Sequence, residues 1–141
     1  MSPLRPWQRM ALATVTVLVA LLAASWIIAW WLPPAWQQVV PTPLGYLAPI
    51  SYLVTAACMT LGGAIAGRRF LVVALGLTFA LWIATFVLLA NIALATADGG
   101  HPLFAVFRTN VASAVLSLAA AALGTHLGAR WQAHRALRAT A

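Results

Sequence analysis

The sequence predicts an all-α integral membrane protein built as a four-helix transmembrane bundle. Hydrophobic residues make up 64% of the 141 residues and charged residues only 6%, against about 25% charged residues in an ordinary soluble domain. A soluble fold of this length needs a polar surface that this chain lacks, and a disordered chain needs low hydrophobicity. In addition, four apolar segments each exceed the roughly 18 residues that indicate a transmembrane helix.

The four predicted helices span about residues 10–32, 45–67, 70–95 and 103–129. The first segment is longer than the roughly 7–15 apolar residues of a signal peptide, so we expect it to be a retained helix. It ends in tryptophans, which are typical of a membrane interface. Transmembrane strands would require alternating apolar and polar residues over segments of about ten, and the sequence shows no such pattern. We therefore expect no strands.

The connections between these segments are short. Four prolines, at positions 33, 34, 41 and 43, interrupt the first connection, which therefore cannot be helical throughout. Pro49 is expected in the first turn of the second helix. Arg68 and Arg69 mark a tight turn, and residues 98–102 form the last connection. Such turns predict antiparallel neighbours in one transmembrane domain over residues 1–141, with a short basic tail at 130–141.

The arginines predict the orientation. All of them except Arg108 flank the apolar segments on one side of the membrane, at positions 5, 9, 68, 69, 130, 135 and 138. The positive-inside rule then places both termini in the cytoplasm. Arginine is the only strongly basic residue type, and alanine is abundant, which is typical of GC-rich bacterial genomes; we expect the inner (plasma) membrane. Because the arginines flank apolar runs, the net charge of +7 predicts lipid contact and no nucleic-acid partner.

Small residues recur four positions apart near the ends of the second and fourth helices, as Gly63 with Gly67 and as Gly124 with Gly128. Such pairs let helix backbones approach closely in lipid, so we expect packing faces. The alternative is that these faces line a narrow conduit. Residues 61–68 and 123–130 also share one pattern, a leucine and glycine followed by small residues and an arginine. Either a duplicated hairpin or convergence would produce it.

The inventory of reactive side chains argues against an enzyme. Asp98 is the only acidic side chain, so paired-carboxylate catalysis is excluded. Small four-helix multidrug exporters are similar to this chain in size, but their membrane-embedded glutamate has no counterpart here. The histidines at 101, 126 and 134 are far apart, and Cys58 is the only cysteine. We therefore expect no metal, no cofactor and no redox pair.

Arg108 is the one charged residue inside an apolar segment. Asn91 in the third helix lies at a matching depth, and Asn110 follows in the fourth. One interpretation is an anion site in the outer half of the membrane. The other is snorkelling, because side chains lean toward the helix N-terminus and would carry the guanidinium to the headgroups.

Two functional hypotheses follow. The first is a structural or accessory membrane subunit, without enzymatic chemistry, that packs against itself or against a larger membrane complex. The second is a small channel, holin-like pore or uncoupled transporter that uses the small-residue faces and Arg108.

Overall fold

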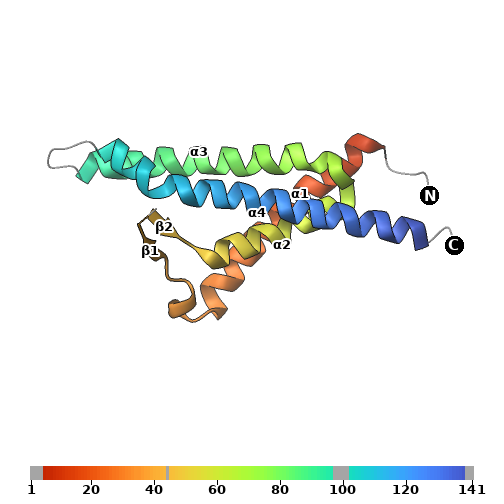
Figure 1. Ribbon diagram of the computed structural model, residues 1–141, viewed down its shortest axis with the longest axis horizontal. Helices are drawn as coiled ribbons and strands as arrows, with labels where there is room; N and C mark the ends of the chain where they lie inside the picture. The colour runs from red at the N-terminus through yellow and green to blue at the C-terminus, as the bar shows by residue number, and fades with distance from the viewer. Residues whose placement is uncertain (1–4, 44, 97–101, 139–141) are drawn as a thin grey trace.

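The computed structural model describes residues 5–43, 45–96 and 102–138, and within them the fold is all-α apart from one short hairpin (Figure 1). Its helices are α1 (Pro6–Trp31), α2 (Pro49–Ala66), α3 (Phe70–Thr96) and α4 (Pro102–Arg138). Three helical stretches in these residues are long and apolar enough to cross a membrane, namely Pro6–Trp31, Pro49–Ala95 and Leu103–Arg135. The second of these stretches contains both α2 and α3.

Helix α1 begins four residues earlier than the apolar pattern predicts. Pro6 occupies the first helical position, where its missing N–H costs nothing. The side chain of Gln8 accepts a hydrogen bond of 2.9 Å from the backbone N–H of Arg5. These two local features extend the helix through polar residues, which a search for apolar residues leaves out.

The connection between α1 and α2 contains the strands that the sequence prediction missed. After a 3₁₀ turn, η1 (Pro34–Trp36), strand β1 (Val40–Thr42) pairs antiparallel with β2 (Gly45–Leu47). The predicted second helix included residues 45–48, and this was wrong. A proline at position 49 disfavours helical backbone at the residue before it, so α2 begins at Pro49 itself.

The end of α1 is closed by a side chain from this connection. Two prolines follow Leu32 and stop the helix, so the last backbone hydrogen bond of α1 is that of the Leu32 N–H to the carbonyl of Ile28, at 3.2 Å. The amide of Gln37 donates hydrogen bonds of 2.9 Å to the carbonyl of Ile28 and 2.8 Å to that of Leu32. The Gln37 side chain therefore adds a second hydrogen bond at the carbonyl of Ile28 and caps the carbonyl of Leu32.

The predicted tight turn at Arg68 and Arg69 is present as the 3₁₀ turn η2 (Gly67–Arg69). Gly67 has a φ of 70°, a backbone conformation that a residue with a Cβ rarely adopts. The chain reverses here, and Phe70 begins α3 with its side chain fully buried. Phe70 packs on α2, where its ring occupies the space that a side chain at Gly62 would fill.

The basic tail that the sequence predicts from residue 130 onward is helical in its described part. Helix α4 continues through Arg130 to Arg138. No glycine or proline follows Gly128, and alanine, leucine and arginine are strong helix formers. Arg135 and Arg138 lie in the last turn, where the helix dipole favours cations. The last connection, residues 97–101, and residues 139–141 lie outside the described residues.

The most extensive contact in the described part of the chain joins α2 and α4, which are not consecutive. They run in the same direction, because Gly124 lies against Ala56 and Gly128 against Thr60. The consecutive pair α2 and α3 makes few contacts. Small residues explain the difference, since they let the backbones of α2 and α4 approach more closely than large side chains would allow.

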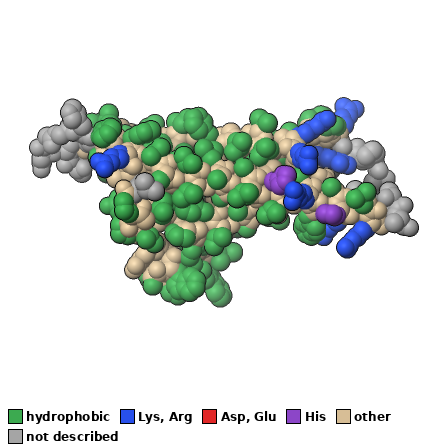
Figure 2. All heavy atoms as spheres, viewed as in Figure 1, with side chains coloured by type: hydrophobic (Ala, Val, Ile, Leu, Met, Phe, Trp, Pro, Cys, Tyr) green, Lys and Arg blue, Asp and Glu red, His purple; other side chains and the backbone are tan. Residues whose placement is uncertain are grey.

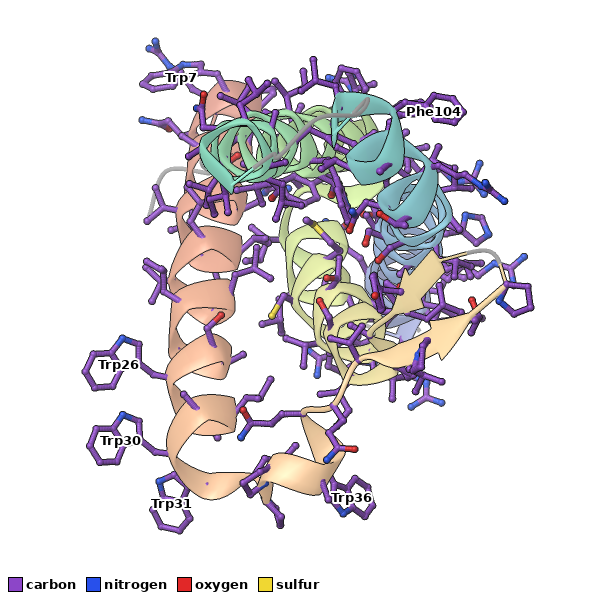
Figure 3. All side chains as sticks on the ribbon, turned by 90° about the vertical axis from the view of Figure 1, so that its left-hand side faces the viewer. Trp7, Trp26, Trp30, Trp31, Trp36 and Phe104 are labelled. Carbon is purple, nitrogen blue, oxygen red and sulfur yellow. The ribbon has the colours of Figure 1, made fainter. Side chains whose placement is uncertain are left out.

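Helix α1 runs obliquely to α3 and α4 (Figures 1 and 3). Only its first half contributes fully buried side chains, Ala13 and Val17, to the core. The core also contains residues from the other three helices: Cys58, Met59, Phe70, Ala74 and Ala121. The second half of α1 diverges, and Trp26, Trp30 and Trp31 project from it into the surroundings (Figure 3).

Candidate functional site

The glycines that the sequence singles out lie where α2 meets α4. A Cβ atom placed on Gly63 would collide with the carbonyl oxygen of Thr125. In the reciprocal direction, a Cβ on Gly124 would collide with the carbonyl oxygen of Ala56. Backbone therefore lies directly against backbone at these positions. Such an approach gains dispersion contacts and leaves no space for a side chain or a permeating ion.

Gly128 and Gly67 occupy different environments. A Cβ on Gly128 would collide with the carbonyl oxygen of Thr60, so Gly128 belongs to the same contact. Gly67 instead lies in the turn after α2, where a Cβ would stand 2.7 Å from the side-chain oxygen of Gln132. The pair four residues apart in the second helix thus contains one packing glycine and one turn glycine.

The buried hydroxyl groups of the interior bond to their own helices or to each other. Thr78, Ser117 and Thr125 each donate to the carbonyl four residues earlier, at 2.8 to 2.9 Å. Among the described residues, no buried side-chain nitrogen or oxygen lacks a hydrogen-bond partner. A ligand would have to compete with these bonds.

One hydrogen bond between side chains joins α2 to α4, and the sequence analysis missed it. The hydroxyl oxygens of Tyr52 and Ser113 lie 2.6 Å apart. The Tyr52 oxygen also accepts from the backbone N–H of Ala48, at 3.2 Å, just before α2 begins. A tyrosine hydroxyl in an apolar segment needs a hydrogen-bond partner, and this need is the sequence signal that could have predicted the bond. Its partner depends on the parallel pairing of two helices distant in sequence.

No hydrogen bond links Arg108, Asn110 and Asn91 to one another in the described part of the chain. Arg108 is exposed and lines a shallow pocket with hairpin residues, including Thr42 and Gly45. The Asn110 amide donates within its own helix, to the carbonyl of Val106 at 2.9 Å. Asn91 is exposed on α3 and is not among the residues that line the Arg108 pocket. A site formed by these three residues therefore stays a prediction from the sequence.

The hairpin that contacts the Arg108 region is held against α4 by a glycine. Gly45 has a φ of 117°, and a Cβ there would collide with the carbonyl of Thr109. The hydroxyl of Thr42 donates to the carbonyl of Gly45 at 2.7 Å. This close approach fixes β2 across the N-terminal part of α4.

The arginine side chains gather at one end of the molecule, apart from one at the other end (Figure 2). The start of α1, the turn η2 and the end of α4 meet there. The guanidinium of Arg135 lies 3.9 Å from the ring centroid of Trp131, a cation–π contact. Arg108 lies near the opposite end, seven residues past the last connection.

No metal site is evident in the described part of the chain. His126 and His134 are both exposed on α4, and Cys58 is buried in α2. Within that part, no three His, Cys, Asp or Glu side chains lie close enough to share a metal ion. The third histidine, His101, and the only carboxylate side chain, Asp98, lie outside the described residues.

Comparison with known proteins adds no relative. No family model matches the chain, and neither curated proteins nor solved structures give a significant match.

Proposed function

We propose that the chain is a multi-pass protein of the bacterial inner membrane, with four crossings and both termini in the cytoplasm. Two features support this topology. The turn η2 folds α3 back from α2, which divides one long apolar stretch into two crossings. The arginines gather at the end where α1 starts, α2 and α3 meet, and α4 ends (Figure 2). The positive-inside rule favours the cytoplasm for that end.

The tryptophans of α1 support a crossing by this helix. Trp7 lies near its start, and Trp26 and Trp30 lie near its end, where their rings stack at a centroid distance of 6.3 Å (Figure 3). At about 1.5 Å per residue, Trp7 and Trp26 stand about 28 Å apart along the helix. The hydrocarbon core of a bilayer is about 30 Å thick, and tryptophan concentrates at both of its boundaries.

Within that membrane, we propose a structural or accessory role without enzymatic chemistry. The supporting observation is a contrast between glycines. Gly63, Gly124 and Gly128 are used in the contact of α2 with α4, whereas a Cβ on Gly76 of α3 would meet nothing within 4 Å. Ala80 and Ala84 continue this open face at intervals of four residues, and both are exposed. The chain thus presents to its surroundings the kind of surface on which membrane helices pack.

A second copy of the chain is the partner that we propose for this face of α3. Two such faces would each offer small residues to the other, as a symmetric contact requires. The alternative function, a small channel, holin-like pore or uncoupled transporter, has less support. The small-residue faces that it would use on α2 and α4 lie against each other, and Arg108 is exposed beside the hairpin.

Disulfide cross-linking in native membranes tests whether a second copy of the chain packs on this face of α3. In a Cys58→Ala background, Ala80→Cys should form a covalent dimer under mild oxidation, and Gly76→Ile should abolish that dimer by separating the helices. The matched control is Leu22→Cys on α1, an exposed position on another helix. Equal cross-linking at positions 80 and 22 would contradict the proposal. Ion flux through liposomes containing the pure protein would favour the channel instead.

A further inference from the structure

A pocket at the basic end of the molecule is not part of the contacts described above. It has a volume of about 490 Å³ and lies between the start of α1 and the turn that joins α2 to α3. Its lining combines two arginines, one tryptophan and three small or apolar residues: Pro6, Trp7, Arg9, Met10, Ala66 and Arg69. Two segments about 60 residues apart in the sequence therefore place their cations around one opening.

The charge of this pocket has no acidic counterpart in the described residues. Arg9 and Arg69 are both exposed, and the described residues contain no aspartate or glutamate. The single acidic residue, Asp98, belongs to the connection between the opposite ends of α3 and α4. Two guanidinium groups that share a pocket without a carboxylate repel each other. An anion placed between them would remove that repulsion.

Two of the three helix ends beside the pocket favour an anion. Helix α1 begins at Pro6 and α3 begins at Phe70, directly after Arg69. The N-terminus of a helix carries a partial positive charge, so arginine there is unfavourable to the helix itself. The third helix end at the pocket is the C-terminus of α2 at Ala66, which favours a cation, so Arg69 is placed favourably for α2 and unfavourably for α3. A bound anion would be stabilised by both arginines and by the starts of α1 and α3.

The remaining lining residues point to an amphiphilic occupant. Met10 and Ala66 give the pocket an apolar wall, and the exposed ring of Trp7 stands beside it (Figure 3). Tryptophan concentrates at the level of lipid headgroups, and the pocket lies where the membrane-crossing helices end. An arginine fork can bind phosphate oxygens in two parallel hydrogen bonds, and basic pockets between membrane helices bind anionic headgroups.

We propose that Arg9 and Arg69 bind the phosphate headgroup of an anionic phospholipid, while Trp7 and Met10 contact the start of its acyl chains. This inference depends on the membrane location of the chain. It does not depend on the partner proposed for α3. A free phosphate ion would gain nothing from the apolar wall, so the lipid is the favoured source of the anion.

Thermal unfolding with added lipid tests the proposal. The parent protein in a mild neutral detergent should gain at least about 3 °C in Tm from phosphatidylglycerol. Phosphatidylcholine should give a smaller gain. Arg9→Gln and Arg69→Gln should each lose at least half of the difference between the two lipids. Arg138→Gln removes the same charge from the far end of α4 and should keep the full difference.

Native mass spectrometry of the same variants provides a second readout that does not depend on their stability. The parent and Arg138→Gln should retain phosphatidylglycerol, and the double variant Arg9→Gln with Arg69→Gln should not. Three results would overturn the proposal. They are equal shifts with both lipids, equal loss in Arg138→Gln, and the full shift produced by inorganic phosphate in phosphatidylcholine.

Discussion

At the scale of single residues, the glycines of this chain differ by what surrounds them. Gly128 touches the backbone of a neighbouring helix, Gly67 adopts a positive φ, and Gly76 faces open space. Glycine therefore has three different roles in this chain: it permits helix packing, it forms a turn, and it leaves one helix face open. The sequence shows the spacing of these glycines, but only the fold shows which of them is in contact.

Replacing glycine by alanine separates the packing role from the exposed one. Gly128→Ala should destabilise the protein by about 1–3 kcal/mol, because the new methyl group collides with the carbonyl of Thr60. Gly76→Ala should be neutral or stabilising by up to about 1 kcal/mol, since alanine is the better helix former. Unfolding of both variants in detergent measures the difference. Equal stability would show that α2 and α4 are not in close contact.

Substitutions at Arg108 separate snorkelling from a binding site. Arg108→Lys should change the unfolding free energy by less than about 0.5 kcal/mol, because both side chains carry a charge to the interface. Asn91→Ala should be equally silent, since Asn91 is exposed on α3. If Arg108→Lys, Arg108→Ala and Asn91→Ala all impair stability, the snorkelling interpretation is wrong, because lysine lacks the planar fork of an arginine site.

At the scale of helices and strands, the parallel pair α2 and α4 organises the interior. The link between Tyr52 and Ser113 lies in the N-terminal halves of the two helices, and the glycine contacts continue it toward the basic end. The backbone approach supplies packing, and the hydroxyl pair supplies a directional contact. Together they specify how the two helices align along their length.

A double-mutant cycle measures the hydroxyl pair. Tyr52→Phe and Ser113→Ala should each cost about 0.5–1.5 kcal/mol, and their coupling energy should be about 0.6 kcal/mol, as for other hydrogen bonds between membrane helices. The cycle is needed because Tyr52 also bonds to the N–H of Ala48. Strictly additive costs would mean that the two hydroxyls do not interact.

The sequence predicts the helices of this chain better than their ends and partners. Apolar length identifies all four segments, and Pro49 and Arg68 mark boundaries that the structure shares. The hairpin was missed because its strands have three residues each, too short for an alternating pattern. Helix α4 extends past its apolar part because local helix propensity, which hydropathy does not measure, favours residues 130–138.

The sequence predicts the contacts of the candidate site less completely, because neither helix alone indicates which distant helix it packs against. The packing role of Gly63 was inferred from spacing, but its contact with Thr125 requires the parallel alignment. In the same way, the sequence indicates Arg9 and Arg69 only as two separate markers of membrane orientation. Their shared pocket exists only because η2 returns the chain to the start of α1.

At the scale of the whole molecule, the proposed topology has four crossings with both chain ends on one side of the membrane. The second apolar stretch, Pro49–Ala95, is long enough to be counted as a single span. In the proposed topology the reversal at η2 makes it two crossings, and only then do both termini share a side. An even number of crossings agrees with the meeting of the start of α1, the turn η2 and the end of α4 at one end of the molecule (Figure 1).

Thiol labelling in intact cells tests this topology most directly. Single cysteines would be placed at Ser2, Gln38, Gly100 and His134 in a Cys58→Ala background and exposed to a membrane-impermeant reagent. The account predicts labelling at Gln38 and Gly100, with Ser2 and His134 labelled only after the membrane is permeabilised. Labelling of one chain end but not the other would mean an odd number of crossings, and it would contradict the four-crossing topology.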